Sequence, residues 1–316
     1  MTSTHPHHPS SFGEQVSEAR ALPVADEVHA IAPPLGPDSL IWKFYGDIRV
    51  QLFGFQRLAS TENSIGQLAQ AVSDHSIIFG DFLGRAKRTA VPVLRTVYAP
   101  DPHTWGRTVR DFHKTIKGTM PDGSRYHALN PELFYWAHAS FIDQILYNTD
   151  TFVRRLSYTE KARIFDEGQQ WYRLYGVSAR NQPQTYEEFL RYWDAMLDLM
   201  AGNDIVRYGA GYLRKGIPGP RRIPRPLWNL LSAPLNAYAR TMIAGTLPPQ
   251  ARAACGLTWN EQQERNFQRI AALIRAMNPA FNRLPIRLLY APWAADGWKY
   301  VGRDPRGLHN QPPRNP

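Results

Sequence analysis

The residue of this sequence best placed to do chemistry is His113. The stretch 105–117, WGRTVRDFHKTIK, has the spacing of one helix with an apolar stripe made of Trp105, Val109, Phe112 and Ile116. His113 lies at the edge of this stripe, with Arg110 one turn before it and Lys117 one turn after it. Because burial and positive neighbours both disfavour a protonated imidazole, we expect a lowered pKa and a neutral ring. A neutral imidazole is what a metal centre or heme iron requires, whereas the alternative is a structural histidine in a helix–helix contact.

A second histidine, His138, is predicted to point into the protein core. Helical spacing places it on one face with four apolar residues, Phe134, Phe141, Ile142 and Ile145. A buried histidine needs partners for both ring nitrogens. His138 is therefore either an ordinary core histidine with a backbone partner or a second inward-facing group in the same site as His113.

The segment 84–89, GRAKRT, combines two guanidinium groups with a hydroxyl. Arg85, Arg88 and Thr89 stand at positions i, i+3 and i+4, so a helix would place them on one face. The planar fork of arginine binds carboxylates and phosphates through two hydrogen bonds, so this face suits an anionic group. The alternative is a solvated basic face.

Other arrangements of catalytic residues are not supported by the sequence. Asp74, His75 and Ser76 are consecutive, so on a helix they point in different directions and cannot form a relay among themselves. The G-x-S-x-G, H-E-x-x-H, Walker A and G-x-G-x-x-G motifs are missing. A metal, if present, is then most simply one that brings its own equatorial ligands and takes a single histidine, which describes heme.

The composition bounds the class of partner. The 316 residues carry a net charge of +10, which favours acidic partners, but no basic stripe interleaved with aromatic residues indicates nucleic acid. One cysteine, Cys255, excludes an intramolecular disulfide and fits a reducing compartment. No apolar run approaches the roughly 20 residues of a membrane span, and the N-terminal residues lack a secretion signal. We therefore expect a cytoplasmic protein, with the basic cluster from Arg214 to Arg225 as a contact for an anionic membrane.

Helix signals recur along the chain, whereas strand signals are weak. Asn130 followed by Pro131 predicts a helix start, with the helix running to about Asn148. Capping boxes are predicted at Ser157–Glu160, Thr185–Glu188 and Thr258–Glu261, and the helix after Ser157 is expected to end at Gly176. The segment 121–123, Pro-Asp-Gly, is a turn flanked by helical patterns.

These signals predict an all-α fold. We expect one domain of eight to ten helices over residues 39–293. Residues 1–38 read as a flexible N-terminal arm and residues 294–316 as a disordered tail. The proline-rich segment 216–226 is expected to be a surface connector.

Six short motifs occur in an order typical of one known family. They are Gly46-Asp47-x-Arg49, Asp74-His75-Ser76, Gly84-Arg85-x-x-Arg88-Thr89, Val109-Arg110-x-x-His113, Pro121-Asp122-Gly123 and Trp136-x-His138-Ala139. Each motif alone is weak, but the ordered set is quite specific. The chain from about residue 40 to 277 resembles the MpaB / rubber oxygenase catalytic domain, a family that includes bacterial latex-clearing proteins and a fungal ER-bound oxygenase.

The resemblance implies an all-helical, globin-like fold that holds heme b and cleaves a carbon–carbon double bond of an isoprenoid with O₂. Arg110 and His113 match the Arg-x-x-His motif of the proximal iron ligand, and His138 falls in a further motif near the cofactor. The motif Arg85, Arg88 and Thr89 matches the distal R-x-x-K-T motif, except that Arg88 replaces the lysine. Arginine stays charged and cannot be a reversible iron ligand, which argues against rubber itself as the substrate. Asp74 is the nearest candidate for the acidic residue thought to assist catalysis.

The leading hypothesis is a heme-dependent oxygenase that acts on a hydrophobic small molecule, with isoprenoids as the first candidates. His113 would bind iron, and the arginines would polarise bound oxygen or pair with a heme propionate. The alternative is a non-enzymatic helical protein that binds heme or an apolar ligand without turnover, because both functions use the same residues. The sequence gives no indication of the oligomeric state.

Overall fold

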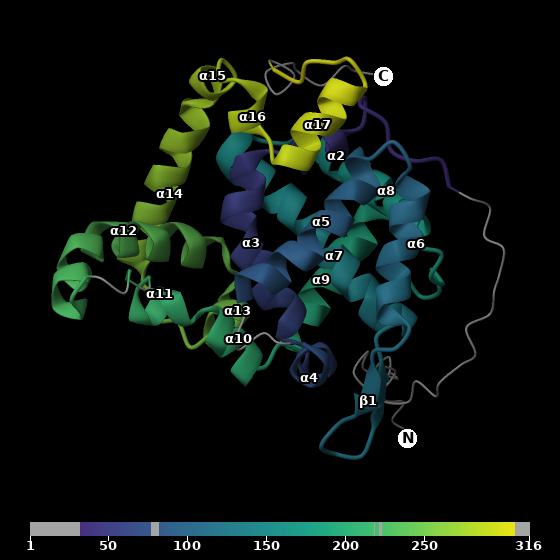
Figure 1. Cartoon of the computed structure of the whole chain (residues 1–316), viewed down its shortest axis with the longest axis horizontal. Helices are drawn as coiled ribbons and strands as arrows, with labels where there is room; N and C mark the ends of the chain where they lie inside the picture. The colour runs from purple at the N-terminus through teal and green to yellow at the C-terminus, as the bar shows by residue number, and fades with distance from the viewer. Residues whose placement is uncertain (1–31, 77–81, 218, 221–222, 307–316) are drawn as a thin grey trace, which may run out of the picture.

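The computed structural model describes residues 32–76, 82–217, 219–220 and 223–306, and at positions 82, 83, 85 and 86 only the backbone. This part of the chain forms sixteen α-helices, one π-helical turn and a two-stranded hairpin, so the all-α class is confirmed (Figure 1). The expected number of eight to ten helices was too low. Apolar periodicity needs several turns to be visible, and helices as short as Asn278–Phe281 do not provide them.

In chain order the elements are α2 (Leu40–Phe44), α3 (Ile48–Asn63), α4 (Gly66–His75), α5 (Phe82–Tyr98), α6 (Pro102–His113), β1 (Lys117–Thr119), β2 (Arg125–His127), α7 (Pro131–Asn148), η1 (Thr149–Val153), α8 (Tyr158–Arg173), α9 (Tyr186–Asp198), α10 (Asp204–Gly209), α11 (Gly211–Lys215), α12 (Arg225–Thr246), α13 (Pro249–Ala254), α14 (Glu261–Ala276), α15 (Asn278–Phe281), α16 (Ile286–Leu289) and α17 (Pro292–Tyr300).

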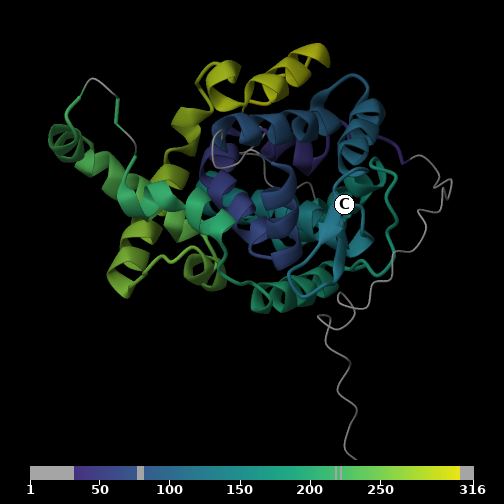
Figure 2. The same cartoon turned by 60° about the horizontal axis from the view of Figure 1, so that its bottom comes forward.

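Helix α7 is the centre of the fold. Most of its residues are buried, including Trp136 and Ile142, which are fully inaccessible. A helix that is apolar all round must be covered on every side. Helices α3 and α8 pack against it, and the α5–α6 pair and α9 complete the surrounding layer (Figure 1). Helices α11, α12 and α14 extend to one side of this bundle (Figure 2).

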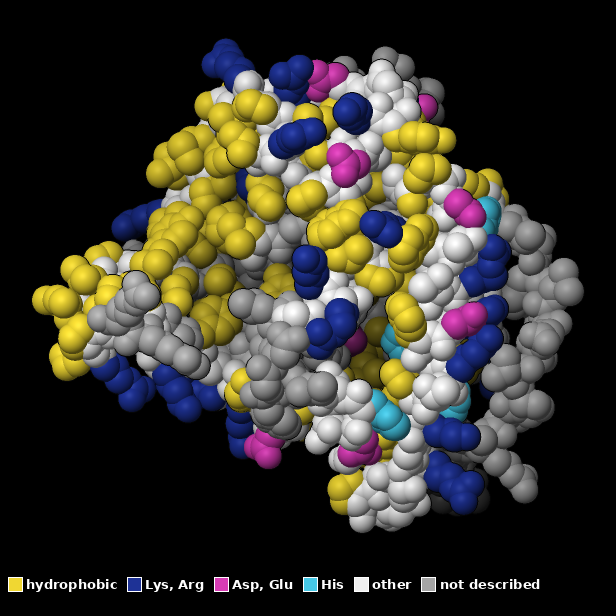
Figure 3. All heavy atoms as spheres, viewed as in Figure 1, with side chains coloured by type: hydrophobic (Ala, Val, Ile, Leu, Met, Phe, Trp, Pro, Cys, Tyr) yellow, Lys and Arg dark blue, Asp and Glu magenta, His cyan; other side chains and the backbone are white. Residues whose placement is uncertain are grey.

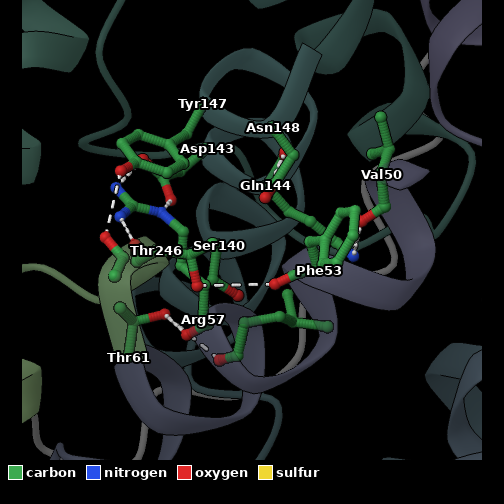
Figure 4. Close-up of polar contacts among 12 residues, drawn as sticks. Val50, Phe53, Arg57, Thr61, Ser140, Asp143, Gln144, Tyr147, Asn148 and Thr246 are labelled. Atoms are coloured by element: carbon green, nitrogen blue, oxygen red, sulfur yellow. Dashed lines mark hydrogen bonds and ion pairs between the residues drawn. The ribbon is translucent and has the colours of Figure 1, made fainter. Parts of the chain in front are cut away.

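A buried ion pair joins three of these helices. The Arg57 guanidinium on α3 donates to both carboxylate oxygens of Asp143 on α7, with the Nη2–Oδ1 bond at 2.8 Å, and to the carbonyl of Thr246 at the end of α12. It also lies 3.9 Å from the centre of the Tyr147 ring (Figure 4). Because a buried charge is tolerated only when it is paired and hydrogen-bonded, these contacts fix the positions of the three helices relative to one another.

The local helix signals were largely correct. Helix α7 has the predicted bounds, and Ser157 forms the predicted capping box with Glu160. Thr185 caps α9, but the Glu188 carboxylate accepts from the Gln184 amide instead of completing the box. After α8 ends at Arg173, the chain passes through Gly176 at φ 65°, the left-handed conformation expected there.

The predicted capping box at Thr258 was wrong. Helix α14 is capped by Asn260, whose side chain forms the reciprocal bonds with Gln263. The Thr258 hydroxyl instead accepts a hydrogen bond from Arg240 of α12. The sequence offers two candidate capping pairs that start two residues apart, Thr258 with Glu261 and Asn260 with Gln263. Because Thr258 is hydrogen-bonded to α12, Asn260 caps the helix.

The turn at residues 121–123 joins strands and not helices. Strands β1 and β2 pair antiparallel on either side of it, and Gly123 adopts φ 86°. The prediction missed them because strands of three residues are too short to show alternation.

The predicted disordered tail begins too early. Residues 292–300 form α17, in which Trp298 is fully buried, and α17 packs on α5. At the other end, residues 1–31 of the predicted arm lie outside the described residues. Its last part is in contact with the core, because the Leu35 carbonyl accepts from the indole of Trp42. Among the described helices, none has the length and apolar character to cross a bilayer.

Candidate functional site

The antiparallel helices α5 and α6 bring two of the sequence motifs together. A short turn joins the helices, and Asp101 caps α6 by accepting from the Thr104 amide at 3.1 Å. The Arg95 guanidinium of α5 lies 4.4 Å from the centre of the Trp105 ring of α6. Both helices rise equally per residue, so the same number of steps from this contact leads to Lys87 on α5 and to His113 on α6. The 84–89 motif and His113 therefore lie at the same end of the helix pair.

His113 is the last residue of α6 and is half-buried. Its Nδ1 lies 2.7 Å from the carbonyl oxygen of Val109, and its ring meets Phe134 of α7 edge-on with centroids 5.4 Å apart. A carbonyl only accepts, so Nδ1 carries a proton, and in the neutral form of the ring the lone pair is on Nε2. Histidines that bind a metal commonly donate their second nitrogen to a carbonyl in this way.

The surroundings of His113 differ from the predicted single stripe. Helix α6 ends at His113, so Ile116 lies beyond it and Lys117 belongs to β1. Phe112 is 58 % exposed and points away from the core. The last turn tightens because the Lys114 amide bonds to the carbonyl three residues earlier, which ends the helix before the stripe is complete.

Arg110 is held by a carboxylate. Its Nε donates to Asp111 Oδ1 at 2.9 Å, and the Lys114 ammonium contacts the same oxygen. The hydrogen bond from Lys114 is the largest effect on the pKa of Asp111 and lowers it; desolvation opposes this effect, and the hydrogen bond from Arg110 adds to the lowering. The expected lowering of the His113 pKa stays a prediction.

The arginine and threonine motif lies on α5, as predicted. Arg88 and Thr89 are exposed, whereas the side chain of Arg85 lies outside the described residues. Thr89 also borders a cavity of ≈ 60 Å³ between α3, α5, α7 and α10. The motif therefore connects the His113 end of the helix pair with an internal cavity.

This cavity has two buried acceptor oxygens. Gln144 Oε1 of α7 and Asn63 Oδ1 of α3 are both buried and have no hydrogen-bond partner within the described part of the chain. Phe141 supplies part of the apolar lining. Because an unsatisfied buried acceptor is costly, the arrangement suits a ligand group or a water that donates hydrogen bonds. Sequence reasoning missed this site, although a glutamine on the buried helix α7 is a signal for it.

Asp74 and His75 connect α4 to the hairpin that follows α6. Asp74 Oδ2 accepts from the Tyr126 hydroxyl at 2.6 Å, and His75 Nε2 lies 3.1 Å from the carbonyl oxygen of Lys117. Desolvation, followed by the bond to Asp74, raises the pKa of Tyr126 to about 12. The two neighbouring residues have separate partners, which agrees with the expectation that they form no relay.

His138 is buried, as predicted, and is 2 % exposed. Its Nε2 lies 2.8 Å from the Gly168 carbonyl, so this nitrogen carries the proton, while Nδ1 has no hydrogen-bond partner among the described residues. Burial lowers its pKa to about 4, against a smaller opposing effect of the Gly168 bond. Phe134 contacts His113, and Tyr175 contacts both Phe134 and His138. The two histidines are thus connected through aromatic rings.

The first of the six motifs has a structural role. The Gly46 amide donates to the Tyr98 hydroxyl at 2.7 Å, and a side chain at position 46 would collide with that ring. Asp47 caps α3 and pairs with Arg49 at 2.7 Å, and Arg49 donates to Asn278. These contacts fix the start of α3 against α5 and α15.

The chemistry of the donor set fits heme. The described residues contain no group of three or more His, Cys, Asp or Glu side chains arranged to hold a metal ion. Heme iron can be held by a single protein imidazole. His113 suits this role because its Nδ1 is bound to the Val109 carbonyl, which assigns the iron to Nε2. Histidine side chains, drawn in cyan, lie beside a hollow on the right of the face in Figure 3.

The sequence was compared with known families and proteins. A family model described as "ER-bound oxygenase mpaB/B'/Rubber oxygenase, catalytic domain" matches residues 42–276. Uncharacterized proteins of Mycobacterium bovis and Mycobacterium tuberculosis are each 24% identical over 163 residues, which is 52% of this chain. The chain spans 61% of the length of these relatives. No solved structure matches.

Proposed function

The chain belongs to the family of the ER-bound oxygenases mpaB/B' and the rubber oxygenases, and we propose that it is a heme-dependent oxygenase for a hydrophobic small molecule. Isoprenoids are the substrate class that we propose first. Cleavage of their carbon–carbon double bond by O₂ breaks that bond and forms two carbonyl groups. Both oxygen atoms enter the product, so the reaction consumes no external reductant.

The position of His113 is the observation that carries the proposal. The Val109 carbonyl holds Nδ1 as the protonated nitrogen, and Phe134 packs against the ring, so the ring has a defined tautomer and orientation. We assign His113 as the residue that would bind the iron of heme b. When bound, heme supplies the iron that activates O₂.

The cationic residues of α5 would hold the anionic edge of the cofactor. Lys87 and Arg88 are exposed at the level of His113, where they suit the propionates. Arg88 donates hydrogen bonds only, so its role is to bind or polarise and not to ligate. Arg110 is already engaged by Asp111, which makes it a positioning residue for the end of α6.

The cavity beside Thr89 would orient the substrate or a water. Phe141 provides apolar contact, while Gln144 and Asn63 offer oxygens that accept from a hydroxyl or a water. Asp74 stands at the end of α4 and binds the hairpin through Tyr126. We assign it to positioning the segment that follows His113. His138, buried behind Phe134, would support the aromatic packing near the cofactor.

Spectroscopy tests this proposal. Protein produced with a heme supply should show a Soret band. His113→Ala should weaken heme binding at least about tenfold, because mutating even a residue that hydrogen-bonds to a metal ligand lowers metal affinity by about this factor. Added imidazole should restore the band, because it can occupy the space left by the ring. His103→Ala, at the other end of α6, is the matched control and should bind heme normally. Colourless wild-type protein, or equal bands in both variants, would refute the proposal.

Oxygen uptake separates an enzyme from a carrier. The heme-loaded protein should consume O₂ when it is given isoprenoids of different chain lengths, with carbonyl products in proportion. A bound heme without uptake across a broad panel would support the non-enzymatic binding protein instead.

A further inference from the structure

Helix α12 has its apolar side turned toward solvent. Four of its large exposed apolar residues, Leu227, Leu231, Leu235 and Tyr238, are spaced by four, four and three positions and so share one face, and Leu230 lies beside them. Leu230 and Leu231 are 73 % and 60 % exposed. An amphipathic helix of a globular protein normally turns such a face to the core, so this exposed row requires a partner.

The polar side of the same helix is bound to the protein. Ser232 is buried and accepts from the Asn236 amide, whose oxygen accepts from the Ile217 amide at 2.9 Å. The Trp228 indole donates to the Ile217 carbonyl at 2.8 Å. These bonds hold the chain before α12 against its polar side. The outward direction of the leucines is therefore fixed by the fold.

The apolar surface extends beyond α12. Leu273 on the neighbouring α14, Met277 at the C-cap of that helix and Leu288 on α16 are also exposed. Helices α11 and α12 project from the helical body (Figures 1 and 2), and apolar side chains cover the corresponding part of the face in Figure 3. An apolar surface of this extent, on helices that project from the body, suits contact with a partner that has a broad surface of its own.

The segment of the chain that carries α12 has charge of one sign. Between Ile205 and Asn260 the sequence contains no Asp or Glu. It contains eight basic residues: Arg207, Arg214, Lys215, Arg221, Arg222, Arg225, Arg240 and Arg252. Lys and Arg side chains border the apolar area at the lower left of Figure 3. A partner of this segment must therefore combine an apolar interior with negative charge at its boundary.

We propose that the exposed face of α12 docks on an anionic lipid bilayer. The leucines enter the boundary between headgroups and acyl chains, and Lys215 and Arg225 contact the phosphates. A second copy related by a two-fold axis fits the surface less well, because each copy would bring its acid-free segment against the same segment of the other. The surface lies on helices other than those that carry His113, so it does not depend on the proposed oxygenase activity.

Sedimentation with lipid vesicles tests the proposal. The full chain is incubated at low salt with vesicles of phosphatidylcholine alone and of phosphatidylcholine with phosphatidylserine. Binding should require phosphatidylserine and should weaken as salt is added. The double variant Leu230→Gln, Leu231→Gln should bind at least about tenfold more weakly, because two well-exposed leucines no longer enter the lipid. Lys215→Gln and Arg225→Gln should each lower affinity roughly fivefold.

Leu190→Gln is the matched control, since it removes an exposed leucine of α9 and should leave binding unchanged. Circular dichroism checks that each variant is folded. The proposal is overturned if the wild-type protein does not bind the anionic vesicles, or if Leu190→Gln weakens binding as much as the double variant. A dimer in solution that the double variant abolishes, without vesicle binding by the wild type, would assign the surface to a second copy instead.

Discussion

The burial of His138 makes the stability of the protein depend on pH. Its native pKa of about 4 lies below the ordinary value of 6.5, because burial disfavours the charged ring. The unfolded chain therefore takes up a proton in a pH range where the native protein does not. This contribution to stability is complete above the unfolded pKa and is lost progressively as the pH falls from about 6.5 to about 4.

The size of the effect follows from the two pKa values of His138. Each unit of difference corresponds to about 1.36 kcal/mol, so the full loss below the native pKa is roughly 3 kcal/mol. Between about pH 7 and about pH 5, linkage gives a loss of roughly 2 kcal/mol, because the native ring is still neutral while most unfolded chains are protonated.

The assay compares wild-type protein with His138→Gln by urea unfolding at both pH values. A glutamine amide can still donate to the Gly168 carbonyl but does not titrate. All other groups contribute equally to both proteins, so the stability of wild type relative to the variant should fall by roughly 2 kcal/mol on acidification. If the difference between wild type and His138→Gln is the same at both pH values, the ring is not held neutral by burial and the reasoning is wrong.

Two further predictions concern packing and the buried ion pair, both measured by urea unfolding. Gly106→Ala should destabilise the protein by about 2–3 kcal/mol, because its Cβ would lie only 2.3 Å from the carbonyl oxygen of Leu174. Gly211→Ala has open space and should be neutral or slightly stabilising, so a loss at both positions would contradict the steric argument. Arg57→Ala should cost about 3–5 kcal/mol because it leaves the Asp143 carboxylate buried and unpaired. Replacing both Arg57 and Asp143 by apolar residues should lower the free energy of unfolding by less than Arg57→Ala does. An equal or larger loss would show that the unpaired charge of Asp143 does not cause the destabilisation.

The parts of the fold that were predicted correctly depend on local interactions. The start of α7 requires only that Asn130 accepts from the amide two residues later and that Pro131 follows it. The start of α8 requires Ser157 and Glu160 to satisfy each other's amides. Such interactions lie within one turn, so their residues are adjacent in the sequence and can be recognised there.

The errors in the prediction arose where distant contacts decide. The Thr258 hydroxyl has a partner on α12, which local spacing does not reveal. Helix α6 ends at His113 and leaves Phe112 exposed, and the hairpin that follows is bound to α4 through Tyr126. A periodic pattern reports which face is apolar over several turns, and it does not report where tertiary contacts stop the helix.

The candidate site shows the same division. His113 and the 84–89 motif were recognised separately, but their common position follows from the antiparallel pairing of α5 with α6 and from the contact between Arg95 and Trp105. The cavity acceptors Asn63 and Gln144 come from different helices, and nothing in either local sequence indicates that they share one cavity. Residue types suggest chemistry, whereas only the packing of helices decides which of them meet.

Helix α12 shows why amphipathic patterns need a structural reference. The spacing of its leucines defines one apolar face, and the usual rule turns such a face inward. Here Ser232 and Asn236 bind within the protein and the leucines face outward. The periodicity is the same for a helix that packs on a core and for one that presents the face to a partner. The side on which the helix makes its polar bonds distinguishes the two cases, and those bonds join residues that are far apart in the chain.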